Sequence, residues 1–279
     1  MGTEEPRAHQ VTGSRDRITP EFILYTIWGW GVAALLTIAS LPLVLTGVVL
    51  CLFLDHDRKL VLPVNQGWCR LICRVMPMWR YEVVGKEHID PGASYVIASN
   101  HLSAADIILL GYVDVPFRWV AKHTIYLVPI FGWQLWLLGH LSIHRGSRSS
   151  RRRLMERAVR TLDAGMSILI FPEGTRTRTG AMRPFKPGGF LIAREARRPV
   201  LPVIISGTFD AMPPNSLLLR KRIHAIVKIL EPVNVTARTD EEIDALIADV
   251  RERMIREKAD LDREAEVKLE RWLLTLRRR

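Results

Sequence analysis

A histidine and an aspartate lie five residues apart directly after a short apolar run. The run is 95–99, and His101 and Asp106 follow it in the stretch Asn-His-Leu-Ser-Ala-Ala-Asp. Five positions along an ideal helix place two side chains roughly 140° apart. The two can therefore meet only if His101 lies in a turn before a helix and Asp106 lies in the first turns of that helix. The carboxylate would then accept the proton of one imidazole nitrogen and leave the other nitrogen as a general base.

A second group of side chains that could bind a ligand or take part in a reaction follows the apolar run 167–171. Here the sequence reads Phe-Pro-Glu-Gly-Thr-Arg and contains Glu173, Gly174 and Arg176. Glycine lets the backbone approach a ligand closely, and the forked arginine donor matches the oxygens of a phosphate. If 167–171 is a strand, these residues lie at the carboxyl edge of a sheet, where α/β proteins place their ligands.

Both motifs depend on strands and turns to position them, and the pattern of the chain predicts an α/β domain. Short β-branched runs alternate with segments of helical composition. The expected strands are 95–99, 119–122, 141–144, 167–171, 200–205 and 225–230, and the expected helices between them are 104–112, 150–164 and 188–197.

The C-terminal part of the chain is predicted to be one long charged helix. Thr239 or Asp240 would cap it, and acidic residues fill its first turn. One face is apolar and consists of Ile243, Leu246, Ile247, Val250 and Met254. The chain ends in Arg277, Arg278 and Arg279, a basic tail that would contact anionic lipid if it lies beside a membrane.

A long uncharged segment near the N-terminus indicates a membrane protein. Residues 22–54 are 33 residues without a charge, more than the roughly 20 that cross a hydrocarbon core. Pro42 could divide the segment, so a single span and a membrane-embedded hairpin both remain open. Basic residues flank it on both sides, with Arg7, Arg15 and Arg17 before it, and their balance places the larger C-terminal part in the cytosol at the inner membrane.

Composition and charge restrict the class of protein and the kind of partner it can bind. The chain has 279 residues, 48% of them hydrophobic and 25% charged, which excludes a disordered chain and a small disulfide scaffold. Its net charge of +11 favours an anionic partner. Three cysteines without paired spacing predict reduced thiols and no metal site. Seven arginines between 145 and 160, opposed only by Glu156, favour a solvated or lipid-facing helix over a phosphate-binding site.

In their order and separation, the motifs resemble four sequence blocks of the glycerolipid acyltransferases. The likeness is greatest to the membrane 1-acyl-glycerol-3-phosphate (lysophosphatidic acid) acyltransferases and covers about 85–207. The stretch 100–106 resembles the NHxSxxD block, and 171–176 matches FPEGTR. The second block corresponds to 120–122, 129–133 and 139–145, and the fourth to 200–203. The resemblance implies a mixed α/β sheet of the acyltransferase type, flanked by helices and joined to the N-terminal membrane segment and the C-terminal charged helix.

The resemblance also implies roles for individual residues. His101 would deprotonate the acceptor hydroxyl while Asp106 orients the imidazole. Arg145 and Arg176 would grip the phosphate of the acceptor, with Lys122 as a further substrate-binding residue. Glu173 would either bind an acceptor hydroxyl or organise the arginines, and Gly174 would keep the turn open. Family members commonly carry acids where Thr124 and His144 stand here, a departure that concerns acceptor preference.

The implied activity is acyl transfer from acyl-CoA or acyl-carrier protein to lysophosphatidic acid, giving phosphatidic acid in phospholipid biosynthesis. No cofactor is expected beyond this thioester co-substrate. Another lyso-lipid acceptor, such as a lyso-aminolipid, is the alternative within the class. A basic, membrane-tethered protein without enzymatic activity is a more distant alternative. Expected partners are the lysophospholipid, the acyl thioester and anionic membrane lipid; nucleic acid is not expected because no nucleic-acid-binding signature occurs.

The predicted organisation has five parts. These are a polar tail at 1–21, a membrane segment at 22–54, a linker at 55–84, a catalytic domain at 85–238, and a C-terminal amphipathic helix with a basic tail at 239–279.

Overall fold

The computed structural model describes residues 19–277 except 77–78, 213–215, 221 and 236–238. Most of the tail predicted at 1–21, including its arginines, therefore lies outside the described residues, as do Arg278 and Arg279.

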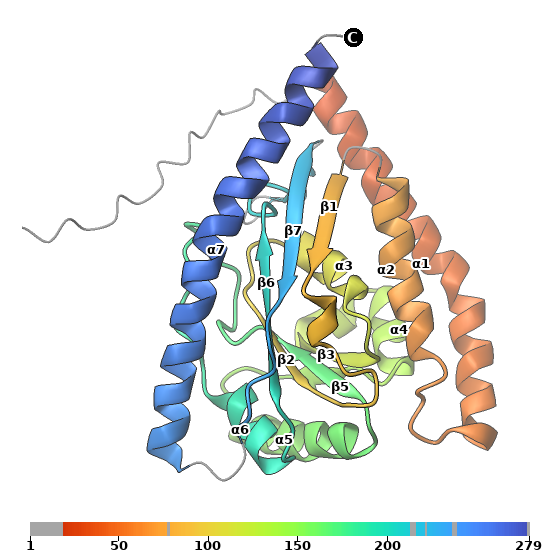
Figure 1. Ribbon diagram of the computed structural model, residues 1–279. Helices are drawn as coiled ribbons and strands as arrows, with labels where there is room; N and C mark the ends of the chain where they lie inside the picture. Colours follow the sequence, from red (N-terminus) through yellow and green to blue (C-terminus); the bar gives the residue numbers. More distant parts are fainter. Residues whose placement is uncertain (1–18, 77–78, 213–215, 221, 236–238, 278–279) are drawn as a thin grey trace, which may run out of the picture.

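A seven-stranded sheet forms the centre of the molecule (Figure 1). Its strand order is β1-β7-β6-β2-β5-β3-β4. The strands are β1 (Trp79–Val84), β2 (Val96–Ser99), β3 (Phe117–Lys122), β4 (Leu141–Ile143), β5 (Ser167–Ile170), β6 (Val200–Ser206) and β7 (Ile223–Ile229). All six strands expected from the sequence are present, with ends shifted by one or two residues.

The directions of the strands bring the predicted motifs to one edge. β6, β2, β5, β3 and β4 are parallel, whereas β7 is antiparallel to β6 and β1 is parallel to β7. The expectation of a mixed sheet is therefore confirmed. Because the carboxyl ends of β2 and β5 lie side by side, the segments that start at Asn100 and Phe171 emerge next to each other.

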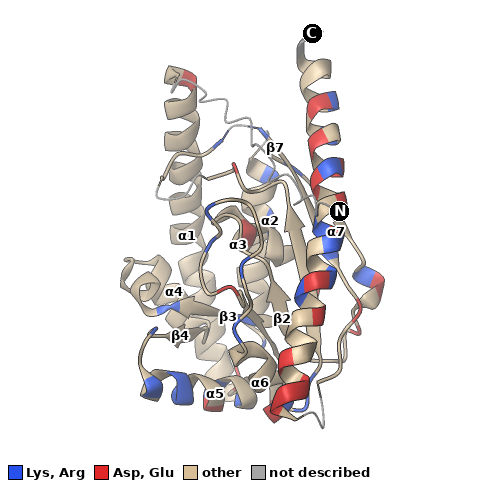
Figure 2. Cartoon of the chain, turned by 90° about the vertical axis from the view of Figure 1, so that its left-hand side faces the viewer, with Lys and Arg blue, Asp and Glu red and all other residues tan. Residues whose placement is uncertain are grey.

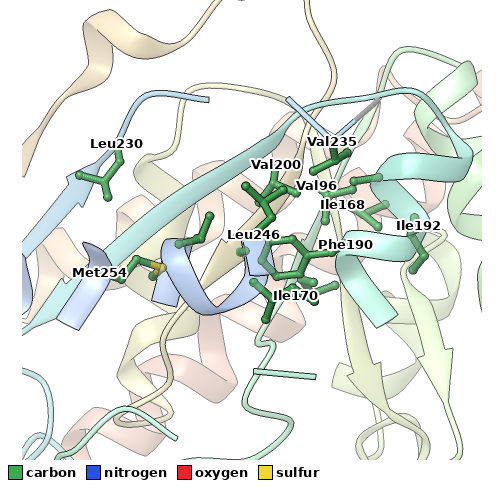
Figure 3. Packing of buried hydrophobic residues seen from close by; sticks show 14 of the residues in the cluster. Val96, Ile168, Ile170, Phe190, Ile192, Val200, Leu230, Val235, Leu246 and Met254 are labelled. Carbon is green, nitrogen blue, oxygen red and sulfur yellow. The ribbon is translucent and has the colours of Figure 1, made fainter. Parts of the chain in front are cut away.

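Helices cover both faces of the sheet. On one face, α5 (Arg148–Asp163), α6 (Gly188–Glu195) and α7 (Asp240–Arg277) share a core with the sheet that includes Phe190, Ile170 and Leu246 (Figure 3). The other face packs against α2 (Leu62–Val75), α3 (Ala105–Leu109) and α4 (Phe131–Leu137). Three short 3₁₀ helices, Lys86–His88, Leu110–Tyr112 and His123–Leu127, complete the fold.

The long C-terminal helix α7 begins as its sequence predicts. Thr239 Oγ1 accepts a hydrogen bond from Glu242 N, and Glu242 Oε2 accepts one from Thr239 N, which is a capping box. The predicted apolar face, from Ile243 to Met254, is buried against the sheet. Farther along, Lys268 pairs with Glu82 of β1 at 2.5 Å, so charge also ties the helix to the sheet.

The uncharged N-terminal segment forms one continuous helix, α1 (Pro20–Leu54). Pro42 lies inside it without ending it, so of the two alternatives the hairpin is not formed and the segment is a single helix. One edge of α1 is buried against the rest of the molecule at residues from Tyr25 to Cys51. Within the described residues, α1 is the one helix long and apolar enough to cross a membrane.

The segment 55–84 differs from the linker predicted for it. It contains α2, which packs on α1 and α3, and β1, which pairs along its whole length with β7. The folded domain thus begins before Gly85. The strand was missed because β1 has one buried end and a half-buried centre, and therefore shows neither clean alternation nor an apolar run.

Candidate active site

The predicted pair of His101 and Asp106 is formed. His101 lies in the turn after β2, and Asp106 lies in the first turn of α3. The distance from His101 Nδ1 to Asp106 Oδ2 is 2.9 Å. The side chain of Asp106 is fully buried, whereas that of His101 is 14% exposed. With Nδ1 engaged by the carboxylate, Nε2 is the nitrogen left to exchange a proton with a substrate.

Asp106 is held by more than the imidazole. Its Oδ2 also accepts hydrogen bonds from the backbone N–H groups of Leu102 and Ser103, at 2.7 and 2.8 Å. Its Oδ1 accepts one from the hydroxyl of Thr208 at 2.6 Å. Four donors therefore fix the carboxylate, which in turn fixes the ring of His101.

Thr208 was not anticipated from the sequence. It follows β6 and is fully buried. Gly207 precedes it with φ of +78°, and a Cβ there would lie 2.0 Å from the carbonyl oxygen of His224. This turn therefore requires glycine. The pair Gly-Thr directly after an apolar strand was the available signal, but nothing in the sequence links it to Asp106.

Glu173 supports the same turn from the other side. It is 2% exposed, its Oε1 accepts a hydrogen bond from His101 N, and its Oε2 accepts one from Arg183 N, both at 2.8 Å. Burial raises the pKa of this carboxyl, and the two backbone hydrogen bonds oppose the shift. Of the two roles left open for Glu173, the geometry favours organisation, although the groups it organises are backbone amides and not arginine side chains.

An aromatic ring orients the imidazole further. Phe171, at the end of β5, stacks on His101 with ring centroids 3.8 Å apart and planes inclined by 12°. The backbone N–H of Thr177 donates to the carbonyl oxygen of His101 at 3.0 Å. The two sequence motifs therefore form one unit in which the 171–177 segment holds the His101 turn.

A cavity of about 950 Å³ opens beside the imidazole. Of the predicted site residues, His101, Lys122, Arg145 and Gly174 line it. Gly174 has φ of +73°, and the side chain of Lys186 crosses it where a Cβ would lie. Asp106 and Glu173 lie behind this lining.

Arg176 does not line the cavity. Its Nη1 is shielded from solvent yet has no hydrogen-bond partner among the described residues. A shielded guanidinium nitrogen of this kind is a ready donor for an anion. The predicted pair of Arg145 and Arg176 is thus divided between the cavity wall and a position outside it.

The cavity lies where the sheet splits. β3 pairs with β5 only at Phe117–Trp119, and then leaves it to pair with β4 at Val120–Lys122. Beyond Trp119 the two strands are no longer hydrogen-bonded, and apolar side chains from both faces of the sheet line the gap. These include Trp119, Ile125, Leu135, Ile143, Met155 and Ile192.

Within the described residues, no cluster of three or more His, Cys, Asp or Glu could hold a metal ion. The three cysteines are buried and unbonded.

Comparison with known proteins places the site in a family. The profile of the Acyltransferase family matches residues 80–206. The matched segment is similar to the acyltransferase family over somewhat less than half of the chain. It contains every site residue predicted from the sequence, and the resemblance on which those predictions rested is confirmed. Thr208 lies just beyond the matched segment.

Individual relatives of this chain are named for one reaction. A 1-acyl-sn-glycerol-3-phosphate acyltransferase of Chlamydomonas reinhardtii is 35% identical over 179 residues, covering 62% of this chain and 53% of the relative. The alpha form from Mus musculus is 33% identical over 180 residues, covering 63% of this chain and 62% of the relative. The chain spans between half and two thirds of the length of these relatives.

A solved structure extends the likeness to the whole fold. The crystal structure of the 1-acyl-sn-glycerophosphate (LPA) acyltransferase PlsC from Thermotoga maritima is 26% identical. It superposes with a TM-score of 0.72, covering 85% of this chain and 95% of that one. The acyltransferase-type fold expected from the sequence is confirmed.

Proposed function

We propose that this acyltransferase moves a fatty acyl group from an acyl thioester to the free hydroxyl of lysophosphatidic acid, giving phosphatidic acid. The observation that carries the proposal is the orientation of His101 by the buried Asp106 at the wall of a large apolar cavity. The names of the relatives support the acceptor. The thioester is acyl-CoA or an acyl-carrier protein, and no other cofactor enters the reaction.

The reaction needs one base and no covalent acyl-enzyme. His101 Nε2 takes the proton of the acceptor hydroxyl as its oxygen attacks the thioester carbonyl. The tetrahedral intermediate then collapses, the carbon–sulfur bond breaks, and the imidazolium returns its proton to the departing thiolate. Asp106 stabilises the imidazolium and keeps Nδ1 protonated throughout. A thioester is already activated, so positioning and proton transfer supply most of what the enzyme must add.

The apolar cavity suits the acyl chain. Its walls are mostly hydrocarbon, and its volume of about 950 Å³ is at the upper end of the usual range for small-molecule sites. A chain held there would keep its carbonyl carbon near His101, at the cavity wall. Burial of each methylene contributes about 0.8 kcal/mol, so a long acyl chain is bound well by such a site.

Basic residues near the imidazole suit the phosphate of the acceptor. Lys122 and Arg145 line the cavity and are exposed to solvent. Arg176 belongs to the same sequence block as Glu173, and its Nη1 is shielded from solvent and has no hydrogen-bond partner among the described residues. A phosphate monoester carries up to two negative charges, and two of its oxygens can accept parallel hydrogen bonds from one guanidinium group. We infer that these cations select a phosphorylated lyso-lipid.

The site of action is a membrane surface in this proposal. Helix α1 exposes most of its apolar side chains, and only 17% of its most apolar stretch is buried in the protein. A lysophospholipid resides in the bilayer, while both thioester donors are soluble in the cytosol. We infer that α1 holds the catalytic edge at the cytosolic face of the inner membrane.

An acceptor panel with one fixed donor tests the function. Purified protein is mixed with palmitoyl-CoA and, in turn, lysophosphatidic acid, a lysophosphatidylcholine and a lyso-aminolipid, and both thiol release and lipid product are measured. Product with lysophosphatidic acid first among the acceptors supports the proposal. Preference for the lyso-aminolipid would favour the alternative acceptor. Absence of thiol release with every acceptor would favour a binding protein.

A further inference from the structure

A second uncharged segment lies beside the cavity and has no part in the chemistry above. Residues 124–139 contain no Asp, Glu, Lys or Arg. Four large apolar side chains of this segment are exposed to solvent: Leu127 at 69%, Val128 at 48%, Trp133 at 58% and Trp136 at 66%. We call these four residues the α4 ridge. Exposed apolar patches of this kind mark surfaces that bind a partner.

The inner side of the same segment forms the cavity wall. Ile125, Phe131 and Leu135 alternate with the ridge residues along the chain and line the cavity beside His101. Leu135 is 2% exposed, in contrast to its neighbour Trp136. One thin element therefore separates the ridge from the space proposed for the acyl chain.

The ridge adjoins α1. Gln134 Nε2 donates hydrogen bonds to the carbonyl oxygen of Thr37 and to Ser40 Oγ, at 2.6 and 2.9 Å. At the other end of α4, Arg58 Nη1 donates to the carbonyl oxygen of Leu137 at 2.9 Å. Figure 2 shows α4 beside α1 at the left of the molecule, opposite α7. The ridge is therefore carried by an element that packs directly beside the apolar helix α1.

The stretches of sequence that flank the ridge carry charge of one sign. Residues 115–155 contain no Asp or Glu. Lys122 precedes the ridge, and Arg145, Arg148, Arg151, Arg152 and Arg153 follow it; all six are exposed. In Figure 2 the blue residues at the start of α5 lie below α4 on the same side of the molecule. An apolar strip bordered by cations complements an anionic lipid leaflet, with hydrocarbon against the strip and headgroups against the cations.

We infer that the α4 ridge is a second membrane-contacting element, distinct from α1, which inserts Leu127, Val128, Trp133 and Trp136 into an anionic leaflet. Tryptophan prefers the depth at which headgroup and hydrocarbon meet. Insertion there would set the cavity wall against the leaflet, so that a lysolipid enters from the bilayer without passing through water. This route of entry rests on the proposed function, whereas the insertion itself does not.

Depth measurement on the full chain tests the insertion. Trp133→Cys is labelled with an environment-sensitive fluorophore; Cys51, Cys69 and Cys73 are buried. A matched label at Glu266→Cys, an exposed position on α7, is the control. In vesicles of phosphatidylcholine and phosphatidylglycerol, we expect spin-labelled lipid to quench the label at 133 and aqueous iodide to quench the label at 266. Equal iodide quenching at both positions would overturn the inference, whether or not the protein shows acyltransferase activity.

Kinetics test the route of entry. The double variant Trp133→Ser/Trp136→Ser is expected to raise the KM for long-chain acceptor in vesicles about tenfold, because two large apolar side chains no longer enter the leaflet. The KM for a short-chain acceptor dissolved as monomers should stay unchanged. The matched control is Ile255→Ser/Val267→Ser, which removes exposed apolar side chains from α7. Equal effects of the ridge variant on both acceptors would contradict the route, and inactivity of the unmodified protein on both would contradict the proposed function instead.

Discussion

The hydroxyl of Thr208 donates a hydrogen bond to Asp106 Oδ1 at 2.6 Å, and both side chains are fully buried. It connects the turn after β6 to the pair formed after β2. The carboxylate that orients His101 is therefore positioned from a third strand, and the catalytic geometry depends on a residue that no substrate needs to touch.

Substitution of Thr208 should lower turnover without weakening substrate binding. Thr208→Val keeps the shape and removes the hydroxyl, which leaves Asp106 with one donor fewer. We expect kcat to fall about two- to tenfold, with KM values unchanged, since the loss of one hydrogen bond corresponds to about 0.5–1.5 kcal/mol. Thr208→Ser restores the donor and should recover most of the activity. If serine and valine at this position lower kcat equally, the hydroxyl does not position Asp106.

Substitution of Glu173 should lower the stability of the protein more than it weakens substrate binding. Glu173→Gln places an amide NH₂ against one of two backbone donors, and we expect the free energy of unfolding to fall by about 1–3 kcal/mol. Thermal unfolding in detergent measures this, with Glu156→Gln on the exposed face of α5 as the control. A rise in acceptor KM at unchanged stability would instead indicate contact with the acceptor hydroxyl.

The arginines should respond to geometry as well as charge. Arg145→Lys and Arg176→Lys retain a positive charge but lose the guanidinium fork. Each is expected to raise the KM for lysophosphatidic acid while leaving the KM for the thioester nearly unchanged. If both grip one phosphate, the double variant will show coupling. Equal losses on an acceptor without a phosphate monoester would favour a different lyso-lipid.

A buried histidine away from the site should shape the dependence of stability on pH. Burial lowers the pKa of His140 to about 3, and the charge of Arg118 adds to the shift. Since unfolded histidine has a pKa of about 6.5, the unfolded chain binds more protons between these values, and stability falls by up to about 1.4 kcal/mol per unit as pH drops.

His140→Asn keeps an acceptor for the backbone N–H of Trp119, which His140 Nδ1 accepts at 3.0 Å. We expect this variant to lose less stability than the wild type between about pH 7 and about pH 5. Thermal midpoints of both proteins at the two pH values check this. Parallel losses would show that another group is responsible.

Sequence reasoning reached the fold and the contact between His101 and Asp106 for identifiable reasons. The runs that form β2, β5, β6 and β7 are buried on both faces, so their apolar character marks them as strands. His101 and Asp106 are close in the chain, and only one turn geometry brings them together.

Other features depend on contacts between distant segments. Thr208 meets Asp106 across 102 positions, and the backbone N–H of His101 meets Glu173 across 72. Neither pairing leaves a periodic signal. The cavity arises because β3 changes partner after Trp119, and strand register of this kind is invisible in a single sequence. Helix α1 likewise packs against α2 and α4, and a hydropathy pattern does not describe these contacts.

The central claim is that His101 Nε2 removes the proton of the acceptor hydroxyl. The most direct test is the single-turnover rate of purified His101→Ala with lysophosphatidic acid and palmitoyl-CoA, in protein shown to keep its thermal midpoint. The account predicts a rate lower by about 10² to 10⁴, the contribution of a general base. A rate within a few-fold of the unmodified protein would contradict it.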